Sequence, residues 1–169
     1  MPPFTDRGCL PPGIWAIAWG DFWERYGYNS RRVNLLSGLM FALKLLVQSG
    51  CREVYIGGSF ITNKERPNDI DGCFDGMSID ISLLAPIFND LDEQHARFGC
   101  ELRMDWMSAF QGFIKKNRDG EQVGIVVINL NSLISNKYVI NRDSKRTSIQ
   151  MNPDFSIFDI EVHNSVTHS

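Results

Sequence analysis

A helical segment that leads directly into a short strand and a pair of glycines most constrains the fold of this chain. Apolar residues recur at helical spacing along the segment, namely Leu35, Leu36, Leu39, Met40, Ala42, Leu43, Leu46 and Val47. Ser30 is predicted to cap the start of this helix, and Ser49-Gly50 to end it. Residues 53–56 follow as a predicted strand that leads into Gly57-Gly58-Ser59. A helix so close to a strand predicts a sheet with helices packed on it.

Further segments complete a pattern of strands and helices. Residues 1–13 are expected to be irregular, and an aromatic group that includes Trp15 surrounds a short predicted helix over 19–26. The predicted strands then cover 69–74, 100–105, 123–130 and 157–162, and the predicted helices cover 83–88, 90–98 and 106–113. We therefore predict an α/β (α+β) fold, a mixed β-sheet of about four to five strands with flanking helices mainly on one side.

Length and charge limit the class of protein. With 169 residues the chain suits one domain, which we place at residues 1–134, followed by a C-terminal extension of unknown role over 135–169. The formal net charge of -3 argues against a broad, sequence-independent grip on nucleic acid. The most apolar stretch, 33–47, contains Asn34, Ser37 and Lys44 and is too short to span a bilayer, so no membrane association is expected.

The start of the chain and the cysteines both favour the cytoplasm. The first residues lack a basic segment followed by an apolar core, so no secretory signal is expected. The four cysteines lie far apart in the sequence, at Cys9, Cys51, Cys73 and Cys100. Two disulfides or a metal site are one interpretation, but thiols in a reducing compartment are favoured.

Two aspartates at alternate positions suggest a metal site. On a strand, side chains at i and i+2 point to the same side, so Asp69 and Asp71 would present two carboxylates roughly 6–7 Å apart. Two such groups repel each other unless a cation lies between them. Magnesium binds through carboxylates and substrate phosphates, and it suits this pair.

The glycines before this pair suggest a phosphate site. Gly57 and Gly58 directly after a strand allow the backbone N–H groups to approach a phosphate closely, and Ser59 adds a hydroxyl donor. Lys64 lies in the following loop, where its charge could meet triphosphate oxygens, whereas Arg66 is better explained as a solvated charge. A nucleoside triphosphate, with ATP as the default, would bridge the glycines and the metal ligands, as in two-metal catalysis. Each motif alone is usually a plain turn or a solvated strand, so the signal lies in their order and spacing.

Gly57-Gly58-Ser59 followed by Asp69-Ile70-Asp71 resembles the signature of the polymerase-β nucleotidyltransferase superfamily. The segments 55–64 and 67–71 are similar to a group of small bacterial nucleotidyltransferase-like proteins, as are Leu10-Pro11-Pro12-Gly13-Ile14-Trp15 and Arg118-Asp119-Gly120. The likeness covers roughly residues 10–130. It implies a nucleotidyltransferase-like mixed sheet, magnesium dependence, and transfer of a nucleotidyl group from a nucleoside triphosphate.

The resemblance also implies a third carboxylate on a neighbouring strand. Glu101 is the candidate because it lies near the start of the predicted strand that follows the helix ending at Phe98. Asp105 is the rival, since alternation places both on the same side of the strand as Arg103. The candidate catalytic and metal-binding residues are therefore Asp69, Asp71 and Glu101. His95, His163 and His168 are not spaced as ligands and are left out.

These motifs predict a magnesium-dependent nucleotidyltransferase that acts on an acceptor hydroxyl of a protein, an RNA or a small molecule. The negative net charge favours a protein or small-molecule acceptor over RNA. The resemblance implies a toxin–antitoxin or phage-defence setting, and a homodimer or a partner protein is expected to complete the shallow site. The alternative is a non-catalytic nucleotide-sensing or protein-binding module that retains the fold.

Overall fold

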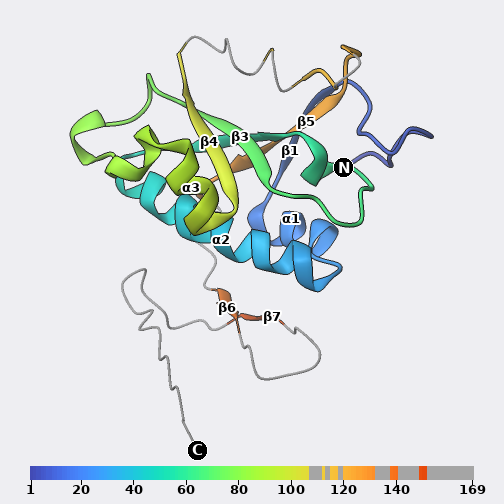
Figure 1. Ribbon diagram of the computed structural model, residues 1–169, viewed down its shortest axis with the longest axis horizontal. Coiled ribbons are helices and arrows are strands. Elements are labelled where there is room, and N and C mark those ends of the chain that lie inside the picture. Colours follow the sequence, from blue (N-terminus) through green and yellow to red (C-terminus); the bar gives the residue numbers. More distant parts are fainter. Residues whose placement is uncertain (107–111, 113–114, 118–119, 132–137, 141–148, 152–169) are drawn as a thin grey trace, which may run out of the picture. The chain divides into compact units, whose positions relative to one another are not determined.

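In the computed structural model, the described residues are 1–106, 112, 115–117, 120–131, 138–140 and 149–151. They belong to two units, Met1–Leu130 and Asn131–Ser169. The first unit carries the sheet and helices shown in Figure 1. In the second unit, β6 (Tyr138–Ile140) pairs with β7 (Ile149–Met151) in an antiparallel ladder.

The first unit is built on a five-stranded mixed sheet in the order β1-β5-β2-β3-β4. Its strands are β1 (Gly13–Ile17), β2 (Glu53–Gly57), β3 (Ile70–Asp75), β4 (Cys100–Asp105) and β5 (Gly124–Asn129). β2 lies antiparallel to both β5 and β3, whereas the pairs β1–β5 and β3–β4 are parallel. The mixed sheet of the predicted α/β class is therefore confirmed.

Helices cover one face of this sheet (Figure 1). They are α1 (Trp19–Tyr26), α2 (Ser30–Gln48) and α3 (Leu91–Phe98). Alternate strand residues point toward the helices and are fully buried, namely Val54, Ile56, Ile70, Phe74, Leu102, Val126 and Ile128. The helices contribute Phe22, Leu36, Leu39, Leu43 and Leu46 to the same core. The other strand residues, among them Asp71 and Glu101, therefore point to the opposite face.

Several local predictions need correction. Ser30 is the first residue of α2, and the cap is Asn29, whose side chain accepts a hydrogen bond from the backbone N–H of Arg32 at 3.0 Å. The helix expected over 83–88 is two short 3-10 turns, Ile81–Leu83 and Pro86–Asn89, because Pro86 cannot continue a helix from the residues before it.

Strand β1 was missed by the sequence analysis. Its five residues, Gly13–Ile17, are all apolar and none is fully buried, so the strand shows no alternation of apolar and polar positions. The predicted helix over 106–113 falls largely outside the described residues, and the predicted strand over 157–162 does so entirely.

No helix in the described part of the chain is both long enough and apolar enough to cross a membrane.

Candidate functional site

Three neighbouring strands place a glycine and two carboxylates in one row across the sheet. Gly57 of β2 lies opposite Asp71 of β3, and Asp71 lies opposite Glu101 of β4. Residues opposite each other on neighbouring strands point to the same face, so Asp71 and Glu101 share the face that α1, α2 and α3 leave uncovered. Both side chains are partly exposed. Residues separated by 44 positions in the sequence are thus brought together at one edge of the sheet.

The next residue, Gly58, lies directly against the carboxylate of Asp71. Gly58 has a φ of +67°, in the region that disfavours residues with a side chain. A Cβ atom at this position would come within 2.2 Å of Asp71 Oδ2. Glycine is therefore required here for two reasons, its backbone conformation and the space that the carboxylate occupies.

The loop from Phe60 to Asn68 connects the glycines to the aspartates and is held by the start of α2. The buried guanidinium of Arg32 donates hydrogen bonds to the backbone carbonyls of Phe60 at 2.8 Å, Thr62 at 3.0 Å and Lys64 at 2.8 Å. These bonds turn the carbonyl oxygens of the loop toward the Arg32 guanidinium, and so fix the path of the chain between the glycines and the aspartates.

Two neighbours of Arg32 hold the second half of this loop. Asn29 Nδ2 donates to the carbonyl of Glu65 at 2.8 Å, and Arg31 donates to the carbonyls of Pro67, at 3.1 Å, and Asn68. The side chain of the predicted phosphate ligand Lys64 is exposed, whereas its backbone is fixed. Ser59 is half-buried and begins a short 3-10 turn, with its carbonyl accepting from the backbone N–H of Thr62.

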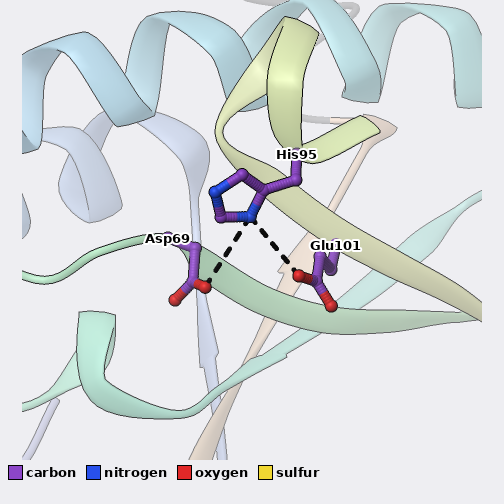
Figure 2. A group of neighbouring side chains, drawn as sticks. All are labelled: Asp69, His95 and Glu101. Atoms are coloured by element: carbon purple, nitrogen blue, oxygen red, sulfur yellow. Dashed lines mark ion pairs between the residues drawn. The ribbon is translucent and has the colours of Figure 1, made fainter. Parts of the chain in front are cut away.

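A histidine from α3 joins two of the predicted site residues. His95 Nδ1 lies 3.8 Å from Asp69 Oδ2 and 3.3 Å from Glu101 Oε1 (Figure 2). One donor atom from each of the three side chains lies within 4.8 Å of the others. Asp69 precedes β3 and does not belong to the row of Asp71 and Glu101, so the carboxylates approach His95 from two different strand starts.

The connection between β3 and β4 explains why His95 lies there. These strands are parallel, so α3 must run back across the sheet and end where both strands begin. Gly99 ends α3 in a left-handed conformation and donates its N–H to the carbonyl of His95. The carbonyl of Gly99 then accepts from the N–H of Ile70 at 3.1 Å. The last turn of α3 is thus fixed beside Asp69 and Glu101.

Two close contacts hold α3 in this position. Gly38 of α2 allows the helices to touch, since a Cβ atom there would lie 2.0 Å from the carbonyl oxygen of Phe98. The buried side chain of Gln94 accepts a hydrogen bond from the backbone N–H of Leu102 in β4 at 2.9 Å. The position of His95 therefore depends on rigid elements rather than on a loop.

The two candidates for a third carboxylate occupy different surroundings. Glu101 is partly exposed, lies opposite Asp71, and also pairs with Arg103 at 3.6 Å. Asp105 lies opposite Asp75 at the far end of β4 and is only 4% exposed. Its Oδ2 accepts a long hydrogen bond of 3.9 Å from the thiol of Cys73. Glu101 is thus the one that lies beside the predicted metal ligands.

All four cysteines are free thiols, as the interpretation favoured by the sequence predicted. Burial raises the pKa of the Cys100 thiol to about 12, and the charge of the adjacent Glu101 acts in the same direction. Burial and the charge of Asp105 raise the pKa of Cys73 to about 12 as well. At neutral pH both thiols are therefore protonated and poor nucleophiles.

The donor atoms fit a divalent cation. Carboxylate oxygens are the donors that magnesium prefers, and partial exposure leaves room for the water and phosphate ligands that magnesium retains. The carboxylates of Asp69 and Glu101 converge, whereas Asp71 lies opposite Glu101 and is not in the group whose donors all lie within 4.8 Å of one another. His95 adds a nitrogen donor beside them. The sequence analysis excluded His95 because its spacing from Asp69 and Glu101 matches no short motif. The connection from β3 through α3 to β4, within residues 70–105, is what relates them, because it brings the end of α3 to the start of both strands.

Comparison with known proteins identifies a family. Residues 2–129 match the profile of a family of unknown function, DUF6932, and the chain belongs to that family. The matched region covers β1 to β5 and all of the site residues described above. No curated protein and no solved structure gives a significant match.

Proposed function

We propose that this protein is a magnesium-dependent nucleotidyltransferase, which moves a nucleoside monophosphate from a nucleoside triphosphate to an acceptor hydroxyl. The observation that supports this most is the row formed by Gly57, Asp71 and Glu101, with Gly58 against the Asp71 carboxylate and Asp69 next to it. A glycine backbone of the kind that binds phosphate and carboxylates of the kind that bind metal ions thereby lie side by side on one face of the sheet. Such an arrangement suits a triphosphate that contacts both.

In the proposed reaction, the acceptor oxygen forms a bond to the α-phosphorus while the bond from that phosphorus to the β-phosphate oxygen breaks. Pyrophosphate leaves, and the proton of the hydroxyl passes to a carboxylate of the site and then to solvent. Magnesium bound by Asp69, Asp71 and Glu101 would supply charge stabilisation for the phosphates and would lower the pKa of the hydroxyl. Gly57, Gly58 and Ser59 would hold the phosphates, and the exposed Lys64 would reach their outer oxygens.

The proposal also names, in general terms, the nucleotide donor and the class of acceptor. ATP is the default donor, and a protein or small molecule suits the net charge of -3 better than RNA does. The site extends from the central strand β2 across β3 to the edge strand β4 of a small sheet, so a second copy of the chain or a partner protein would supply the remaining walls. We place this activity in the cytoplasm, within a toxin–antitoxin or phage-defence pair.

Calorimetry with ATP, GTP, CTP and UTP, with and without magnesium, tests the proposal. Asp71→Asn keeps the size of the side chain and removes its charge, so magnesium-dependent binding should be lost. Asp92→Asn is the matched control, because Asp92 is an exposed aspartate on α3 that lies outside the site, and it should bind like the wild type. Absence of binding by the wild-type chain to all four triphosphates would reject the proposal.

A non-catalytic nucleotide-sensing or protein-binding module is the second candidate. One observation favours it, since Asp71 lies outside the group of converging donors from Asp69, His95 and Glu101, so the three predicted catalytic carboxylates do not all meet at one point. A protein that binds triphosphate and releases no pyrophosphate with any acceptor would fit this second candidate.

A further inference from the structure

The ring nitrogen of His95 gives this site a mixed set of donors. Nδ1 faces Asp69 Oδ2 at 3.8 Å and Glu101 Oε1 at 3.3 Å, as the dashed lines in Figure 2 show. The three side chains come from the segment before β3, from α3 and from β4, and each contributes one donor. The three donors therefore come from parts of the chain that are brought together by the fold.

The spacing of these donors suits ligands of one metal ion. Bonds of about 2.0–2.2 Å from nitrogen and oxygen place neighbouring ligands roughly 3–4 Å apart. The two distances from His95 Nδ1 fall in this range. All three side chains are partly exposed, with 46% of the His95 side chain accessible, so an ion and its water ligands have a path to the donors.

The chemistry of the donors selects among divalent ions. Magnesium strongly prefers oxygen ligands and gains little from an imidazole, whereas first-row transition ions bind nitrogen and oxygen donors together. A site with two carboxylates alone would discriminate little between magnesium and manganese. The added imidazole shifts that preference toward the transition ions.

We infer that Asp69, His95 and Glu101 form a binding site for a divalent first-row transition-metal ion, with manganese as the probe. The inference deepens the proposed function by naming a transition ion, in place of magnesium, as the preferred metal of the shared carboxylates Asp69 and Glu101, yet binding of manganese there does not require nucleotidyl transfer. A chain that binds manganese here and no triphosphate would keep this inference and lose the proposed function. A chain that binds triphosphate with magnesium and lacks manganese coordination by His95 would keep the proposed function and lose this inference.

Pulsed electron paramagnetic resonance of the full chain with Mn²⁺ tests the inference directly. Coordination by an imidazole gives a nitrogen hyperfine coupling on the bound ion, which should be present in the wild type and absent in His95→Gln. His163→Gln and His168→Gln remove the other two histidines of the chain and should leave the coupling unchanged. Because His95 is exposed, His95→Gln should fold normally, which circular dichroism checks.

Titration of the same variants with both metals gives the second measure. His95→Gln should weaken Mn²⁺ binding by about tenfold or more, since even the loss of a group behind a ligand commonly costs that much, and should change Mg²⁺ affinity little. Asp69→Asn should weaken both. An equal loss for both ions, a gain in affinity on removing His95, or a wild-type spectrum without nitrogen coupling would each overturn the inference.

Discussion

The two faces of the sheet are made by the same strands but serve different purposes. On the helix side, Phe74 and Leu102 are fully buried in an apolar core. On the other side, Asp71, three residues before Phe74, and Glu101, next to Leu102, are partly exposed and lie against Gly58 and His95 respectively. At the start of β3 and β4, the site residues are therefore one position away from core residues, whereas further along the same face Cys73 and Ile125 are fully buried. Substitutions of the core residues should change folding, and those of Asp71 and Glu101 should change binding.

The largest effect is expected from Phe74→Ala on the helix side. Phe74 is fully buried and packs edge-on against Phe88 with ring centroids 5.5 Å apart. Loss of the ring should lower the free energy of unfolding by about 3–5 kcal/mol. Urea denaturation measures the change. A loss below about 1 kcal/mol, close to the size of a surface effect, would show that this face does not carry the core.

Arg32→Ala should have the next largest effect, and it should weaken both the stability of the fold and triphosphate binding. Its guanidinium is fully buried and satisfies the carbonyls of Phe60, Thr62 and Lys64, which the variant leaves without a donor. We expect a loss of about 2–4 kcal/mol in the free energy of unfolding. Triphosphate binding at the proposed site should weaken as well.

The exposed Arg97, which pairs with Glu93 at 3.9 Å on α3, is the control for Arg32. Arg97→Ala should change the free energy of unfolding by less than about 0.5 kcal/mol. If the two variants lose equal stability in the same denaturation experiment, the carbonyl bonds of Arg32 do not anchor the loop.

Alkaline pH should destabilise the fold through its buried thiols. Burial raises the pKa of Cys100 from 9.0 to about 12, so the folded chain keeps a proton that the unfolded chain loses. The free energy of unfolding is unaffected below pH 9 and should fall at higher pH, by at most about 1.4 kcal/mol per pH unit for one thiol. Urea denaturation of the wild type and of Cys100→Ala above pH 9 measures this fall in the free energy of unfolding. The variant should show the smaller fall with pH.

Gly58→Ala should cost about 1–2 kcal/mol in stability because its φ of +67° disfavours a side chain. The new Cβ atom would also displace the carboxylate of Asp71, which lies 2.2 Å from its position, so triphosphate binding should be lost. Gly120→Ala is the matched control, with a φ of +78° and no atom within 4 Å of its Cβ position. It should lose similar stability and keep its binding. Equal binding by both variants would separate Gly58 from the site.

The smallest effect on stability is expected from Asp71→Asn on the open face. Its side chain is partly exposed, so the free energy of unfolding should change by less than about 0.5 kcal/mol. A loss as large as that of Phe74→Ala would contradict the separation of the two faces. Urea denaturation again provides the comparison.

Sequence patterns predicted the strands and helices of this unit where alternation or helical spacing was strong. The helix from residue 30 and the strands around Ile56, Phe74 and Ile128 follow from apolar residues that face one core. β1 was missed because its five residues are all apolar and none is fully buried, so it lacks that signal. The cap at Asn29 was missed because Ser30, beside it, is also a good capping residue.

The candidate site was predictable where its residues are close in sequence and not where they meet through the fold. Spacing alone related Gly57-Gly58-Ser59 to Asp69 and Asp71, because each motif adjoins a strand. Glu101 remained one of two options until the register placed it opposite Asp71. His95 joins Asp69 through a helix that crosses back over the sheet, and no local pattern encodes such a contact.

Nucleotidyl transfer itself is tested most directly by following the α-phosphate of a labelled triphosphate. The wild type and Asp71→Asn would each be incubated with cell extract, magnesium or manganese, and a triphosphate radiolabelled at the α-phosphate. We expect label to join an acceptor and pyrophosphate to be released with the wild type alone, while both proteins unfold at the same urea concentration. Triphosphate binding with no transferred label and no pyrophosphate above the level of Asp71→Asn would contradict nucleotidyl transfer.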